Sequence, residues 1–75
     1  MSKDDKFIIN FKSQNAIIFT SKIMTEKEAL EEIKSLANFL NDKSSLTYGI
    51  INKDDNPTMF PMSVLSTCYF EVQKV

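Results

Sequence analysis

The clearest hydrophobic pattern in the chain runs from Thr25 to Asn41. Apolar residues recur there at the three- and four-residue spacing of one helical stripe: Ala29, Leu30, Ile33, Leu36, Ala37 and Leu40. Thr25 followed by Glu28 fits a capping box. The pattern therefore predicts an α-helix over residues 26–41 whose stripe faces a core. Phe39 lies outside the stripe, so it either folds back over the margin of a sheet or stays partly exposed.

Two strand patterns precede this helix. In residues 6–12, Phe7, Ile9 and Phe11 alternate with polar residues, with Ile8 as the one exception, as in a half-buried strand. Residues 16–23 resume β-branched and aromatic side chains after a polar break that contains Asn15. Because Asn tolerates a left-handed backbone, the two runs predict a β-hairpin. Residues 1–5 are mostly charged or polar and are predicted to be a disordered leader.

Two further strand patterns follow the helix. Residues 46–52 have strand composition, residues 53–57 indicate a turn, and residues 63–73 are predicted to be the returning strand of a second hairpin. Pro61 has no N–H for a ladder, so it belongs at a strand margin, an edge or a bulge. Gly49, the only glycine, indicates close backbone packing or a bulge.

The order of these elements predicts the fold. Strand, strand, helix, strand and strand over residues 6–75 indicate a small single α+β domain, in which one helix packs on one face of a four-stranded, mainly antiparallel sheet. The opposite, helix-free face would then keep more apolar side chains than a surface in water usually carries. We predict that this face is a protein interface, centred on Ile8, Ile18, Ile51, Leu65 and Tyr69.

The segment around Pro61 offers a second candidate contact. Two flexible thioethers flank an aromatic ring there, a combination that suits an adaptable surface: Met59, Phe60 and Met62. The alternative is a satellite core that covers one end of the sheet.

Composition removes most catalytic chemistry. The chain has no histidine, so it lacks an imidazole base and a zinc cluster of Cys/His type. Its single cysteine, Cys68, lies in an apolar run and is expected to be an inert packing residue. There is no glycine-rich phosphate loop, and residues 54–56 lack the spaced carboxylates of an EF-hand. We therefore expect no enzymatic activity, cofactor, metal or small-molecule substrate.

Charge disfavours nucleic acid as a partner. All nine basic residues are lysines, and ten carboxylates bring the net charge to −1. The alternative function is single-stranded nucleic-acid binding, with bases stacked on Tyr48 and Tyr69 and the phosphates followed by three lysines: Lys6, Lys12 and Lys22. The acidic helix flank of Glu28, Glu31 and Glu32 is the ordinary way to solvate such a face; mimicry of nucleic acid is its other interpretation.

The leading hypothesis is a non-enzymatic protein-protein interaction module. It would be a small regulator or inhibitor, of the kind that mobile elements encode, and would bind a protein partner or itself. A chain of 75 residues buries a smaller fraction of its surface than a larger chain does, so formation of a homodimer would add stability. The charged start and the lack of a long apolar run predict no membrane segment and a cytoplasmic location.

Overall fold

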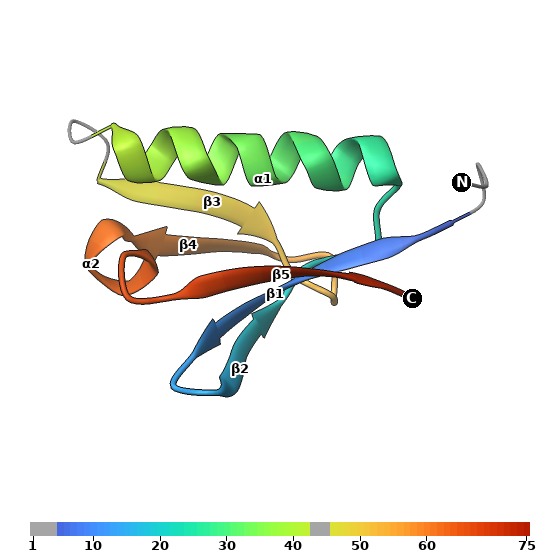
Figure 1. The fold of residues 1–75 in the computed structure, drawn as a ribbon, viewed down its shortest axis with the longest axis horizontal. Helices are drawn as coiled ribbons and strands as arrows, with labels where there is room; N and C mark the ends of the chain where they lie inside the picture. Colours follow the sequence, from blue (N-terminus) through green and yellow to red (C-terminus); the bar gives the residue numbers. More distant parts are fainter. Residues whose placement is uncertain (1–4, 43–45) are drawn as a thin grey trace.

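The computed structural model describes residues 5–42 and 46–75. In chain order, the elements are β1 (Phe7–Ser13), β2 (Ala16–Thr20), α1 (Glu26–Asn41), β3 (Thr47–Ile51), β4 (Pro57–Pro61), α2 (Met62–Leu65) and β5 (Tyr69–Lys74). Figure 1 shows α1 along the long axis of the molecule, with β3 next to it and the β1–β2 hairpin reaching away from it. The fold is α+β with antiparallel strands, as predicted. Of the predicted leader, residues 1–4 lie outside the described residues, whereas Asp5 forms an ion pair with Lys74 (3.3 Å).

The main helix begins where the sequence predicts. Glu28 N donates to Thr25 Oγ1 (3.2 Å) and Thr25 N donates to Glu28 Oε1 (2.9 Å), which completes the capping box. The buried side of the helix, however, is rotated from the predicted stripe. Phe39 is buried, with its ring centroid 5.3 Å from that of Tyr48 in β3, whereas Leu30 is exposed. Phe39 therefore folds back over the sheet margin, the first of the two predicted alternatives.

The first hairpin also follows the prediction. Gln14 and Asn15 both have positive φ (51° and 67°), the geometry of a tight turn between two twisted strands. Phe11 is paired with Phe19 and Lys12 with Ile17, so Ile18 is the extra residue of a β-bulge. The bulge leaves Ile17 and Ile18 exposed while Phe19 stays in the core.

The prediction of a single four-stranded sheet is wrong. The strands form a three-stranded sheet in the order β2-β1-β5 and a separate two-stranded sheet of β3 and β4. An isolated bridge between Ser21 and Asn52 connects the two sheets. It is supported by hydrogen bonds from Lys22 N to Ile51 O and from Lys53 N to Thr20 O, both 3.1 Å. The helix is therefore packed against two sheets at once, not laid across one.

The predicted strand over residues 63–73 is confirmed for residues 69–73 but is wrong for residues 63–68, and its predicted pairing in a second hairpin is also wrong. The partner of β3 is β4, which ends at Pro61, and the chain then forms the short helix α2 before β5 begins at Tyr69. Pro61 does lie at a strand margin, as predicted. β5 pairs with β1, which places Val72 opposite Ile9 and Phe70 opposite Phe11. This long-range pairing explains the error, because the local pattern shows that a segment is a strand but not which strand it meets.

The core is centred on Phe11, which is fully buried. Its ring centroid lies 4.8 Å from those of Phe19 and Phe70 and 5.2 Å from that of Phe60. These rings come from β2, β5 and β4, so one cluster touches both sheets. The buried core consists of Ile9, Phe11, Phe19, Met24, Ala29, Leu36, Phe39, Ile50 and Leu65.

We expect Phe19 and its neighbour Ile18 to respond oppositely to substitution. Phe19→Ala removes a ring that contacts both Phe11 and Phe60, and should lower the free energy of unfolding by about 3–5 kcal/mol. Ile18→Lys changes an exposed bulge residue and should leave the fold intact. Thermal melts followed by circular dichroism measure both. Equal destabilisation by the two variants would contradict the assignment of Ile18 to the surface.

Candidate protein-interaction surface

The predicted interface residues lie apart from one another in the structure. Ile18 and Tyr69 are exposed, and Ile8 and Ile51 are half-buried. Leu65 is fully buried in α2, so it is a core residue and not part of the predicted interface. Ile51 belongs to the two-stranded sheet, whereas Ile8, Ile18 and Tyr69 lie on the three-stranded sheet. The predicted residues therefore do not share one continuous face.

The helix-free face of the three-stranded sheet carries a polar network across its middle. Thr20 Oγ1 donates to Asn10 Oδ1 (2.9 Å), and Asn10 Nδ2 donates to Gln73 Oε1 (2.8 Å). On the same face, Lys12 of β1 and Glu71 of β5 lie diagonally across the strand pair and form an ion pair (3.2 Å). Asn10 is almost fully buried among its neighbours, and its amide is satisfied by these bonds. The centre of this face is polar, contrary to the expectation of an apolar interface.

The segment from Met59 to Met62 divides between core and surface. The ring of Phe60 packs against Phe11 and Phe19, and Met62 is a half-buried neighbour of the core. Met59 is 62% exposed, and its sulfur lies over Gly49, where a Cβ would be only 2.8 Å away. The β3–β4 register is regular, so Gly49 marks close side-chain packing and not a bulge. Of the three predicted contact residues, Met59 alone is largely exposed.

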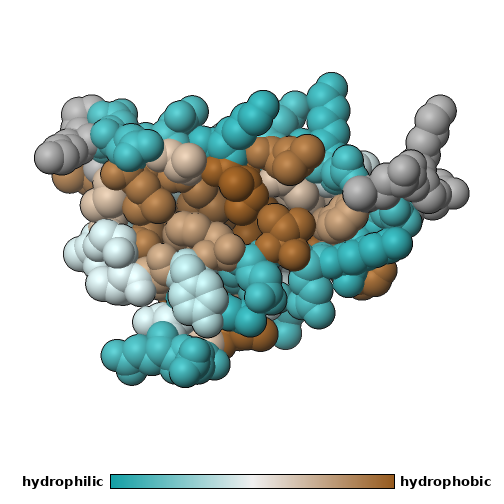
Figure 2. Space-filling model, viewed as in Figure 1, coloured by the Kyte–Doolittle hydropathy of each residue, from teal (hydrophilic) through white to brown (hydrophobic). Residues whose placement is uncertain are grey.

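A more continuous apolar surface lies between α1 and β5. Figure 2 shows hydrophobic side chains gathered in a band across this side of the molecule, below the polar outer surface of the helix. The band contains an apolar groove of about 350 Å³, lined by Phe7, Ala29, Leu30, Val72 and Glu26. The sequence pattern places Phe7, Ala29 and Leu30 in the core and assigns none of the groove to an interface. The signal that could have located it is the width of the apolar helix stripe.

Among the described residues that line this apolar groove, Glu26 is the only charged one. Its Oε2 atom is shielded from solvent and accepts no hydrogen bond from any residue that the structure describes. Burial of a carboxylate oxygen without a donor is unfavourable.

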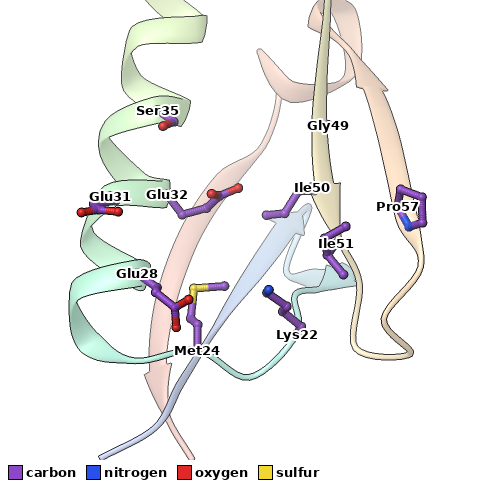
Figure 3. Close-up of a pocket in the computed structure, with 10 residues that line it drawn as sticks. All are labelled: Lys22, Met24, Glu28, Glu31, Glu32, Ser35, Gly49, Ile50, Ile51 and Pro57. Carbon is purple, nitrogen blue, oxygen red and sulfur yellow. The ribbon is translucent and has the colours of Figure 1, made fainter. Parts of the chain in front are cut away.

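A second groove, of about 420 Å³, separates α1 from β3 on the other flank of the helix. Figure 3 shows Glu28 and Glu32 directed into this space, with Lys22 entering from the opposite side. Both carboxylates are already engaged, because Glu28 caps the helix and Glu32 Oε1 accepts from Tyr48 Oη (2.9 Å). The hydrogen bond from the Thr25 backbone lowers the pKa of Glu28.

The groove beside β3 has no evident metal-binding geometry. Within residues 5–42 and 46–75, no three acidic, cysteine or histidine side chains are placed to hold a metal ion. In the same part of the chain, no helix is long and apolar enough to cross a membrane.

The residues of the nucleic-acid alternative are also separated. Tyr48 packs against Phe39 of α1 and donates its hydroxyl to Glu32, so its ring is not free to stack on a base. Tyr69 is exposed on the other sheet, where the neighbouring Lys12 is paired with Glu71. The two tyrosines therefore form no common stacking surface.

Tyr48 should make the fold sensitive to alkaline pH. Burial, and then the hydrogen bond to the Glu32 carboxylate, raise the pKa of Tyr48 above its ordinary value of 10.0. A raised folded-state pKa means that the protonated hydroxyl stabilises the fold fully below pH 10 and that this stabilisation is lost as pH rises further. Melting temperatures measured across this range should fall less steeply for Tyr48→Phe than for the unmodified chain. Tyr69→Phe is the control, and an equal effect of both variants would refute the role of Tyr48.

Three surfaces can thus be compared. The helix-free face is polar at its centre, two of the carboxylates in the groove beside β3 (Glu28 and Glu32) already have partners, and the apolar groove beside β5 is open. A comparison of the chain with known protein families, with curated proteins and with solved structures finds no match.

Proposed function

We propose that the protein is a non-enzymatic protein-interaction module whose contact surface is the apolar groove between α1 and β5. The carrying observation is that Leu30 and Val72, on opposite walls of this groove, keep 55% and 41% of their surface exposed. Burial of such surface by a partner is favourable because it removes apolar area from water. An exposed apolar groove next to a strand edge is a common form of protein-binding site.

The strand edge beside the groove supports a polypeptide partner in particular. β5 is the outer strand of its sheet, and no strand in the described part of the chain pairs with its outer edge. A partner strand can add hydrogen bonds to such an edge while its side chains enter the adjacent groove.

The absence of enzymatic activity is part of the proposal. The carboxylates Glu28 and Glu32 are used in capping and in packing Tyr48, and the chain has no histidine to act as a base near neutral pH. A small regulator or inhibitor needs no chemistry, because it acts by covering a surface of its target. The proposal moves the predicted contact from the helix-free sheet face to the opposite side of β5.

Site-specific photo-crosslinking should locate the contact. A benzophenone amino acid in place of Leu30 lies in the apolar groove and should give covalent adducts in the cells that make the protein. The same amino acid in place of Asn38 is the matched control, because Asn38 is exposed on the outer side of α1, two residues from the buried Leu36.

The expected result is adduct formation from position 30 and little from position 38. Adducts with another protein or with the chain itself both support the proposal. Equal yields from the two positions, or none from position 30, would contradict it. Circular dichroism of both variants shows that each retains its helix before the yields are compared.

A further inference from the structure

The outer edge of β5 presents a symmetric set of free backbone groups. Val75 N donates to Lys6 O (2.9 Å), which shows that Val75 turns its backbone toward β1. Backbone direction alternates along an antiparallel strand, so two other residues of β5 also turn toward β1: Glu71 and Gln73. The intervening residues therefore direct their N–H and C=O groups to the outer edge: Phe70, Val72 and Lys74.

We propose that a second copy of this chain occupies that edge, with its β5 paired antiparallel about a twofold axis at Val72. The inference rests on the proposed function and names the partner. In this register Val72 lies opposite Val72 of the second copy, and Phe70 lies opposite Lys74. The three outward-facing residues are evenly spaced around Val72, so every outward N–H and C=O group of both copies finds a partner.

Charge selects this register over its neighbours. With Glu71 on the axis, two carboxylates would lie directly opposite each other, which is destabilising. With Gln73 on the axis, Val72 would lie opposite Lys74. Phe70 would then have no opposite residue in the second copy, because β5 ends at Lys74. With Val72 on the axis, Glu71 lies opposite Gln73 and keeps its own ion pair with Lys12.

The same arrangement joins the two apolar grooves. A twofold axis perpendicular to the sheet keeps both copies of α1 on the same side of a continuous sheet. Val72 lines the groove and lies at the axis, so the groove of one copy continues into the groove of the other. The methylene stem of Lys74 would pass over the ring of Phe70 from the second copy. Hydrogen bonding and apolar burial are therefore satisfied by one contact.

Two other edge strands of the fold carry features that oppose strand addition: β2 has a bulge in its pairing with β1, and β4 is bounded by prolines. β4 begins with Pro57 and ends with Pro61, and prolines at an edge oppose strand addition. β5 contains no proline, and its pairing with β1 has no bulge. Its charged residues Glu71 and Lys74 are each paired within the chain. β5 therefore lacks both the bulge of β2 and the prolines of β4.

Two variants test the pairing. Val72→Pro removes an outward N–H that β1 does not use, so the chain should stay folded while sedimentation equilibrium at micromolar concentration changes from dimer to monomer. In a Cys68→Ser background, Val72→Cys should form a disulfide dimer under mild oxidation, because hydrogen-bonded partners place their Cα atoms about 5.5 Å apart. Glu71→Cys in the same background is the control and should form no disulfide dimer, because the two thiols at position 71 are displaced from each other by two residues, or about 7 Å, along the strand.

A strictly monomeric unmodified chain would overturn the inference, and so would a dimer that survives Val72→Pro and forms no disulfide through position 72. If Val72→Pro fails to fold, the contrast between cysteines at positions 72 and 71 decides. A monomeric chain that still crosslinks to another protein from position 30 would refute the second copy but retain the proposed function. A dimer that gives no adduct from position 30, that survives Val72→Pro and that forms no disulfide through position 72 would refute both the pairing of β5 and the proposed function.

Discussion

The packing of aromatic rings around Phe11 is the interaction on which the fold depends. The two sheets share one backbone bridge, between Ser21 and Asn52, so side chains must hold them together. Phe11 of β1 meets rings from β2, β5 and β4, including Phe60 of the second sheet. Each such pair adds about 0.5–1.5 kcal/mol to the free energy gained by burial. The association of the sheets is therefore sensitive to loss of any one of these rings.

Elements with local causes were predictable from the sequence. The helix start follows from the Thr25 and Glu28 capping box, and both of its hydrogen bonds form. The first hairpin follows from the polar turn, where Asn15 takes a positive φ. Pro61 was correctly placed at a strand margin, because a missing N–H is a property of the residue itself. These signals act over a few residues and need no knowledge of the tertiary fold.

Features that depend on distant contacts were not predictable. The pairing of β5 with β1 joins the two ends of the chain, and nothing in residues 69–74 specifies β1 over β3. The apolar residues of α2 resemble a strand at this length, so the sequence pattern predicts an exposed Leu65 although the structure buries it. The rotation of α1 depends on Phe39 meeting Tyr48, a contact made across two elements. The candidate surface was missed for the same reason.

The contact between Phe39 and Tyr48 connects the packing of the fold to its open surface. It draws one flank of α1 toward β3, where Tyr48 also bonds to Glu32. An apolar stripe that is wider than the buried arc cannot be covered on both flanks, so Leu30 stays exposed on the flank beside β5. The same packing that completes the core on one side thus leaves an apolar groove on the other, next to a strand edge that lacks proline. A partner bound there would complete the core of the domain and would also extend its sheet.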